Sequence, residues 1–290
     1  MYIIRIFQKS INNPSCLLLP FEVDSVSYDN EIKRTVREFY GKIWKTERTC
    51  CTPSPVSVKV KRVSEHPVHE ALLNEIMPLE GKRILDVGCG NGNTVLKIAE
   101  QVGPYGKAVG IDFSSEGIAE AKKKAAKLGL DKITEFRVAD AEKLPLEDNS
   151  FDAVISECVV CLTPNKQKVL AEKTRVLKPG GKIVMHDVIS KAHMPKAVQT
   201  NSELYCSCIG GAVSQDDYIK MLKKAGLTEI KAVDYSEESA INSQILLAAT
   251  DIEDEKDFQE VVNFIRNGGV GYALFVARKP QQTNLRNKGN

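Results

Sequence analysis

The cysteines are the residues of this chain whose type and spacing most directly suggest chemistry. Six of the eight cysteines form close pairs: Cys50 and Cys51, Cys158 and Cys161, and Cys206 and Cys208. Thiolate sulfur is a preferred ligand of soft metals and metalloids, so these pairs raise the question of soft-metal chemistry. The spacings C-C, C-x-x-C and C-x-C differ from the repeated C-x-x-C of zinc ribbons, which disfavours a four-cysteine zinc site. Eight cysteines in 290 residues are also too dilute for a disulfide scaffold, so we expect free thiols.

A glycine-rich segment, ILDVGCGNGNT at 84–94, gives the second chemical signal. Gly88, Gly90 and Gly92 alternate directly after an apolar run and before a helical pattern. Glycine has no Cβ, so the backbone can turn sharply there and approach a ligand closely. Asp86 stands two residues before the first glycine, and the spacing G-x-G-x-G differs from the G-x-G-x-x-G of dinucleotide-binding folds. The segment predicts a site for a nucleotide-like ligand.

Two further acids follow apolar runs that are typical of strands. Asp112 ends KAVGID, and Asp140 closes TEFRVAD. A carboxylate in the position of Asp112 could accept hydrogen bonds from both hydroxyls of a ribose. Either acid alone would more often cap a strand end, but together with the glycine segment the two favour a cofactor site.

The composition excludes several classes of function. Apolar residues make up 42% and charged residues 27%, which is ordinary for a globular protein. The net charge of +2 does not favour a dedicated nucleic-acid binder. No apolar run approaches the roughly 18 residues that span a bilayer, and the first thirty residues lack the pattern of a secretory signal. We therefore expect no nucleic acid and no membrane among the partners, and a cytoplasmic, reducing location.

Strands and helices must alternate to bring these residues together. Apolar runs typical of buried strands occur at 83–88, 107–112, 134–140, 151–157 and 181–188, and helical segments lie between them at 93–102, 115–130 and 166–177. This alternation predicts a doubly wound α/β core with helices on both faces of a parallel sheet. Beyond it we expect a helical stretch at 193–206, a helix at 216–226, a strand at 228–235, a helix at 253–266 and a last strand at 272–277.

The segment D-x-G-x-G-x-G after the first strand resembles motif I of the class I methyltransferases. FDAVISE and RVLKPGGKIVMHD follow in the order and spacing of the family's later motifs, and the resemblance covers about residues 30–280. It implies a Rossmann-like, seven-stranded, mostly parallel sheet with an N-terminal helical cap and small C-terminal additions. The implied cofactor is S-adenosylmethionine. The cofactor-binding residues that it implies are Tyr40, Asp86, Gly88, Cys89, Gly90, Asn91, Gly92, Asp112, Phe113, Asp140, Ala141 and Glu157.

The cysteine neighbourhoods resemble those of the arsenite methyltransferases. The matching strings are FYGKIWKTERTCCT, SECVVCLTP and CIGGAVSQDDY. The resemblance implies that Cys50 or Cys51, Cys158 and Cys208 are the catalytic thiols that hold trivalent arsenic. The substrate would be arsenite or its thiol conjugate, with an external thiol as reductant. The family often has one more cysteine shortly before motif I, and this chain has none between Cys51 and Cys89.

On this basis the chain divides into five parts. We expect a flexible extension at 1–28, cap helices with a cysteine-containing loop at 29–80, the cofactor-binding core at 81–190, an acceptor-site segment that completes the sheet at 191–280, and a tail at 281–290. The first cap helix is predicted to start at Asp29, whose side chain suits an N-cap, and to run to about residue 45. His69 is interpreted as a surface or loop position.

Several alternatives stay open at this stage. Cysteine is often simply a buried residue, and Cys161 and Cys206 could be alternates or spares for the neighbouring ligands. Tyr40 could close the cofactor pocket or only pack its helix. The acceptor could instead be a small organic molecule of the quinone or phenol type. The chain could also bind the cofactor or a soft metal without catalysis.

Overall fold

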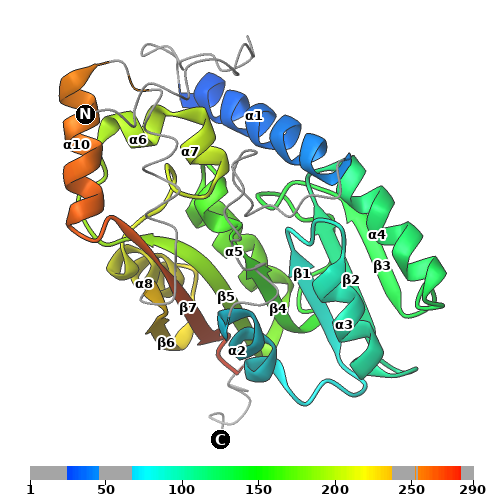
Figure 1. The fold of residues 1–290 in the computed structure, drawn as a ribbon. Coiled ribbons are helices and arrows are strands. Elements are labelled where there is room, and N and C mark those ends of the chain that lie inside the picture. Colours follow the sequence, from blue (N-terminus) through cyan, green and yellow to red (C-terminus); the bar gives the residue numbers. More distant parts are fainter. Residues whose placement is uncertain (1–24, 46–66, 237–251, 253, 282–290) are drawn as a thin grey trace, which may run out of the picture.

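The computed structural model of the chain describes residues 25–45, 67–236, 252 and 254–281. Its centre is a seven-stranded sheet with the order β3-β2-β1-β4-β5-β7-β6. The strands are β1 (Arg83–Val87), β2 (Lys107–Asp112), β3 (Thr134–Val138), β4 (Phe151–Glu157), β5 (Leu177–Ser190), β6 (Thr228–Asp234) and β7 (Val270–Arg278). Strands β1 to β5 pair in parallel, whereas β7 runs antiparallel to both β5 and β6 (Figure 1). The predicted seven-stranded, mostly parallel sheet is confirmed.

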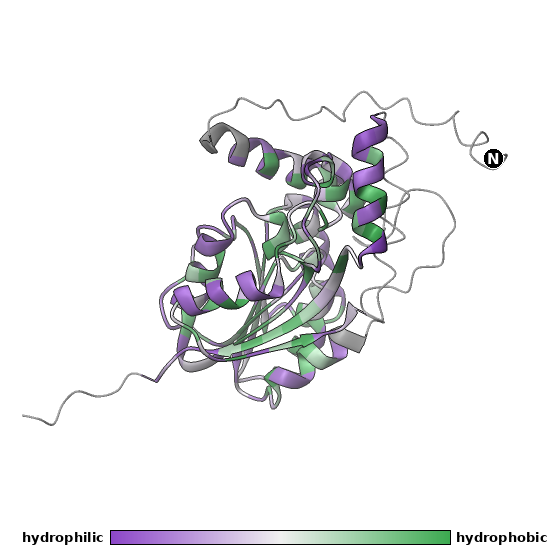
Figure 2. Ribbon diagram, turned by 90° about the vertical axis from the view of Figure 1, so that its left-hand side faces the viewer, coloured by the Kyte–Doolittle hydropathy of each residue, from purple (hydrophilic) through white to green (hydrophobic). Residues whose placement is uncertain are grey.

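Helices cover both faces of this sheet, as a doubly wound fold requires. They are α2 (Pro67–Ile76), α3 (Asn93–Val102), α4 (Ser115–Lys127), α5 (Lys166–Val176) and α8 (Gln215–Lys224). Successive residues of β1 point to opposite faces. Ile84 therefore packs with α2, α3 and α4, whereas Leu85 and Val87 pack with α5 and α8. Figure 2 shows the apolar strands enclosed by helices whose outer surfaces are hydrophilic.

Helix α1 (Ser25–Lys45) crosses the sheet edge at which the parallel strands end, between α4 and α7 (Ser202–Cys206) (Figure 1). It begins at Ser25, four residues before the predicted start, so Asp29 lies inside the helix and is not its N-cap. The added residues SVSY contain neither Gly nor Pro, so nothing in them stops the helix. Boundaries are the part of a helix that sequence patterns define least well.

The segment after β5 differs in one respect from its prediction. The helical stretch expected at 193–206 is divided into α6 (Lys196–Thr200) and α7, because Asn201 takes an extended conformation and its side chain caps α7 by accepting from the Leu204 N–H. Helix α10 (Glu255–Arg266) packs beside α6. The predicted cysteine-containing loop and nearly all of the predicted tail lie outside the described residues. Within the described part of the chain, no helix has the length and apolar character needed to cross a membrane.

Candidate active site

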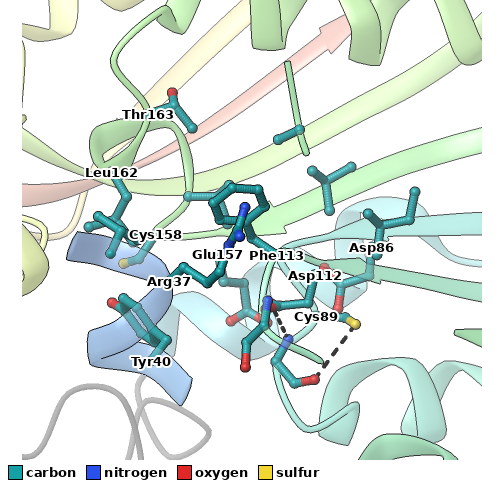
Figure 3. Close-up of a pocket in the computed structure, with 18 of the residues that line it drawn as sticks. Arg37, Tyr40, Asp86, Cys89, Asp112, Phe113, Glu157, Cys158, Leu162 and Thr163 are labelled. Atoms are coloured by element: carbon teal, nitrogen blue, oxygen red, sulfur yellow. Dashed lines mark hydrogen bonds between the residues drawn. The ribbon is translucent and has the colours of Figure 1, made fainter. Parts of the chain in front are cut away.

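A cavity of about 220 Å³ opens at the carboxyl ends of β1, β2 and β4, beneath α1. Ligands of open α/β sheets bind at this edge. In Figure 3, Arg37 and Tyr40 reach the cavity from α1, opposite Asp86, Cys89 and Asp112. The predicted residues that line the cavity are Tyr40, Asp86, Gly88, Cys89, Gly90, Asn91, Asp112, Phe113, Asp140, Ala141, Glu157 and Cys158. Gly92 is not among the lining residues: a Cβ built on it would lie 2.7 Å from Cβ of Ala121 and 2.9 Å from Cε1 of Phe136, so it faces the core and not the cavity.

The glycine loop is shaped by two positions where no other residue fits. Gly88 has a φ of +83°, and a Cβ placed on it would lie 2.2 Å from Cγ2 of Val159. Gly90 has a φ of +52°, and its Cβ would lie 2.5 Å from Cζ2 of Trp44, which lines the same cavity from α1. Both the backbone conformation and the space exclude a side chain. The sharp turn expected of these glycines is therefore observed, and Trp44 of α1 lies against the loop at Gly90.

Asp112 ties the glycine loop to the end of β2. Its Oδ2 accepts a hydrogen bond from the Gly90 N–H, and its Oδ1 accepts one from the Ser114 N–H, each at 2.8 Å. Burial raises the pKa of Asp112, and the backbone hydrogen bonds to Ser114 and Gly90 oppose this shift. Each carboxylate oxygen has a second lone pair, so the group can still accept from a ligand hydroxyl.

Helix α1 is fastened over the cavity by charged side chains. Lys33 Nζ lies 2.9 Å from Asp140 Oδ2 and 2.7 Å from Glu142 Oε2. The Arg37 guanidinium lies 4.0 Å from the centre of the Phe113 ring, a cation–π contact. Asp140 is therefore paired with α1 in this structure, and its Oδ1 accepts from the Glu142 N–H at 2.9 Å.

The surroundings shift the pKa values of two acids of the cavity, Asp86 and Glu157, in opposite directions. Burial raises the pKa of Asp86 well above its usual value, and the nearby carboxylates of Glu157 and Asp112 add to the effect. Burial also acts to raise the pKa of Glu157, but hydrogen bonds from His69 and Thr94 and the proximity of His69 outweigh it and lower that pKa. The lowered pKa favours the charged form of Glu157 at the cavity wall.

His69 is buried beside Glu157, so the prediction that it lies at the surface or in a loop is wrong. His69 is only 5% exposed, because α2 packs over the sheet and carries it to the end of β4. Its Nδ1 lies 2.7 Å from Glu157 Oε2, and Lys97 Nζ lies 3.4 Å from its Nε2. A carboxylate oxygen can only accept, so Nδ1–H of His69 is the donor to Glu157. Thr94 Oγ1 donates to the other carboxylate oxygen at 2.9 Å.

Two of the predicted catalytic cysteines, Cys158 and Cys208, are brought together at the wall of the cavity. The sulfur of Cys208 lies 3.6 Å from the carbonyl oxygen of Cys158 and 3.9 Å from the hydroxyl of Tyr40. Both cysteines have a left-handed backbone, with φ of 53° and 71°. This conformation is uncommon outside glycine, and strain of this kind tends to be kept at functional sites. Tyr40 also donates to the carbonyl of Cys206 at 3.0 Å, which links α1 to the Cys208 segment.

The thiols interact strongly with one another. Hydrogen bonds with the thiols of Cys158 and Cys161, together with Tyr40, lower the pKa of Cys208 well below its usual value against the effect of burial. Burial, followed by the interaction with Cys208, raises the pKa of Cys161. The other two predicted ligands, Cys50 and Cys51, lie outside the described residues. In the described ranges, no three His, Cys, Asp or Glu side chains are already arranged to hold a metal ion.

Several residues of the site were not found from the sequence: Lys33, Arg37, Trp44, His69 and Thr94. Three of them, with Tyr40, recur at helical spacing along α1, so they share the face that covers the cavity. The helical spacing of these residues around Tyr40 could have indicated this face from the sequence. His69 and Glu157 are 88 residues apart in the sequence, so no local pattern could have predicted their contact.

A family model described as a methyltransferase domain matches residues 78–226, just over half of the chain. The chain belongs to this family. The fold and the resemblance of its motifs place it among the class I S-adenosylmethionine-dependent methyltransferases, and S-adenosylmethionine is the cofactor of that family.

Arsenite methyltransferases are among its relatives. The enzyme from Halobacterium salinarum is 38% identical over 151 residues, which are 52% of this chain and 38% of the relative. The one from Aquipseudomonas alcaligenes is 31% identical over 219 residues, which are 69% of this chain and 63% of the relative. The crystal structure of an arsenic(III) S-adenosylmethionine methyltransferase from Chlamydomonas reinhardtii is 27% identical with a TM-score of 0.55, covering 74% of each chain.

Relatives with a different acceptor match a shorter part. A demethylmenaquinone methyltransferase from Bacillus cytotoxicus is 38% identical over 120 residues, which are 40% of this chain and 50% of the relative. The chain spans less than two thirds of the length of each of these curated relatives.

Proposed function

We propose that this chain is an S-adenosylmethionine-dependent methyltransferase whose acceptor is trivalent arsenic bound by Cys158 and Cys208. The observation that carries the proposal is the contact between these two cysteines beside the cofactor cavity, where Cys158 lines the wall and Cys208 has a strongly lowered pKa. The arsenite methyltransferases among its relatives support the same acceptor.

The residues of the cavity fit the cofactor. The loop at Gly88 and Gly90 leaves room that a Cβ would fill, and we propose that Asp112 at the end of β2 accepts from the ribose hydroxyls. Glu157 offers a negative charge to the cationic part of the molecule. Asp140, with Ala141 beside it, is the acid that the resemblance assigns to the adenine. Bound S-adenosylmethionine supplies an electrophilic methyl group on a sulfonium.

The thiols hold the acceptor. Arsenic(III) is soft and binds thiolate sulfur, and a thiolate-bound arsenic keeps a lone pair that can act as the nucleophile. The protein then needs mainly to position the arsenic above the methyl group, without a general base. Cys50 or Cys51 remains the third ligand implied by the resemblance. We further propose a reducing compartment such as the cytoplasm, with an external thiol, because oxidised cysteines could not bind arsenic.

Arsenic speciation tests the proposal. Purified protein is incubated with S-adenosylmethionine, arsenite and glutathione, and methylated arsenic is measured by mass spectrometry. We expect methylarsenic only when protein and cofactor are both present. Cys158→Ser and Cys208→Ser should each lower the rate at least a hundredfold, whereas Cys16→Ser, in the extension predicted at 1–28, should stay within twofold of the parent. A parental rate in either of the first two variants would contradict thiolate capture.

A second candidate acceptor is a small organic molecule of the quinone type, which the demethylmenaquinone methyltransferase match favours. It predicts methyl transfer to the ring of a demethylated quinone with no dependence on Cys158 or Cys208. The same variants, assayed with a quinone acceptor, separate the two candidates. Tight cofactor binding without transfer to either acceptor would instead indicate a non-catalytic binding protein.

A further inference from the structure

We infer that His69 is a positioning residue for the cofactor: it holds the Glu157 carboxylate at the cavity wall, where this carboxylate binds the α-ammonium group of S-adenosylmethionine. The inference rests on the proposed function for the cofactor alone, and it holds for either candidate acceptor. His69 lies before residue 78, at which the match to the methyltransferase family model begins. Its role is therefore a property of this chain and not of the family's motifs.

The sheet places Glu157 level with Asp112 but two strands away. Asp86 of β1 pairs with Gly110 of β2 and with Ile155 of β4, and Asp112 and Glu157 each follow two residues later. Neighbouring strands are about 4.8 Å apart, so about 10 Å separates these two strand ends. The ribose and the α-ammonium group lie in different parts of the cofactor. A ribose at Asp112 therefore directs the amino-acid end across β1 towards Glu157.

Both oxygens of the Glu157 carboxylate accept a hydrogen bond from the protein. Nδ1 of His69 lies 2.7 Å from Oε2, and Thr94 Oγ1 donates to Oε1 at 2.9 Å. His69 belongs to α2 and Thr94 to α3, so two separate helices fix the carboxylate. Each oxygen keeps a second lone pair for a ligand. A carboxylate that is already oriented loses little freedom when a cation binds, which favours binding.

The surroundings of this carboxylate suit an ammonium ligand. His69, Thr94 and Glu157 all line the cavity, and the side chains of His69 and Glu157 are only 6% and 14% exposed. Salt screens a charge pair less in such a partly buried site than at the surface. Burial raises the pKa of Glu157, but the hydrogen bond and the proximity of His69 outweigh this effect. Loss of His69 would therefore remove both the orientation of the carboxylate and an interaction that favours its charged form.

Two ligands isolate the amino-acid end of the cofactor. S-adenosylhomocysteine carries the α-ammonium and α-carboxylate groups, 5′-methylthioadenosine lacks both, and neither carries a sulfonium charge. We would titrate the purified full chain with each ligand and follow the fluorescence of Trp44, which lines the same cavity. Isothermal calorimetry gives an independent value of each dissociation constant.

His69→Phe keeps a planar ring but removes the Nδ1–H donor. This variant should bind S-adenosylhomocysteine at least tenfold more weakly, whereas its affinity for 5′-methylthioadenosine should stay within twofold of the parent, which also shows that it is folded. His69→Asn keeps an N–H donor near the position of Nδ1, so it should bind both ligands within threefold of the parent. The matched control His193→Phe, at an exposed residue, should change neither affinity.

Glu157→Gln tests whether His69 acts through the charge of Glu157. It should show the same selective loss, and adding His69→Phe to it should weaken binding by less than a further twofold. Parental binding of S-adenosylhomocysteine by His69→Phe, an equal loss for both ligands, no recovery in His69→Asn, or additive effects of the two substitutions would overturn the role of His69. Binding of neither ligand by the parent would instead contradict the proposed cofactor site.

Discussion

Replacing Gly90 by Ala should weaken cofactor binding more than the backbone strain of the alanine alone would. An alanine with the φ of +52° found at Gly90 costs about 1–2 kcal/mol. Its Cβ would also lie 2.5 Å from Cζ2 of Trp44, whereas ordinary contact begins at 3.4 Å, so the ring or the loop must move by about 1 Å. Gly90 and Trp44 both line the cavity, so this movement changes the shape of the cavity.

Gly129 provides a matched control. It also has a left-handed backbone, with a φ of +68°, but nothing lies within 4 Å of a Cβ built there. Gly90→Ala and Gly129→Ala should therefore lose similar stability from strain, about 1–2 kcal/mol in urea unfolding. Only Gly90→Ala should raise the dissociation constant of S-adenosylmethionine, by at least tenfold, or about 1.4 kcal/mol.

Trp44 makes the measurement direct, because it is the sole tryptophan of the chain and lines the cavity. Its fluorescence during a titration with S-adenosylmethionine reports binding at the site itself, and isothermal calorimetry gives an independent value. If Gly90→Ala binds the cofactor within twofold of the parent, the glycine loop and α1 do not form the cofactor site as described.

Three further variants test other parts of the site. Asp112→Asn keeps only one of the two charge-assisted hydrogen bonds that the Asp112 carboxylate accepts from the N–H groups of Gly90 and Ser114, a loss of about 1.5–3 kcal/mol. The glycine loop is then less firmly held, so S-adenosylmethionine should bind at least tenfold more weakly in the same titration. The exposed Asp131→Asn should leave cofactor binding unchanged. The pKa of Asp86 is raised in the folded chain, so its contribution to stability falls as pH increases from the unfolded value near 4 through the folded value. Asp86→Asn should therefore raise the melting temperature of the cofactor-free protein at pH 8, by roughly 2–4 °C for each kcal/mol, and the gain should shrink on acidification; no gain at pH 8 would be inconsistent with this electrostatic picture. Tyr40→Phe loses the hydrogen bond to the Cys206 carbonyl, worth about 0.5–1.5 kcal/mol, so kcat/KM for arsenite should fall about two- to tenfold. Tyr105→Phe, at a residue 90% exposed, should leave kcat/KM unchanged. Equal kcat/KM values for the two tyrosine variants would argue against a link between α1 and the acceptor segment.

Much of the fold could be predicted because its elements carry strong local patterns. The continuous apolar runs of β1 and β4 identify strands that are buried on both faces, and the alternation with helices specifies a parallel sheet. The start of α1 and the division of the stretch at 193–206 were predicted wrongly. The division depends on a single residue, Asn201, whose capping bond competes with continuation of the helix.

The sequence by itself determined the cofactor half of the site. Motif spacing along neighbouring strands is enough to place the glycine loop and Asp112 at one edge, because parallel strands end together. Tertiary structure alone decided which partners each residue has. Three contacts join segments that are distant in the chain: the pairing of Glu157 with His69, the ties of Lys33 and Arg37 across the cavity, and the contact of Cys208 with Cys158. Such contacts follow from how helices pack on the sheet, and no local pattern of residues encodes them.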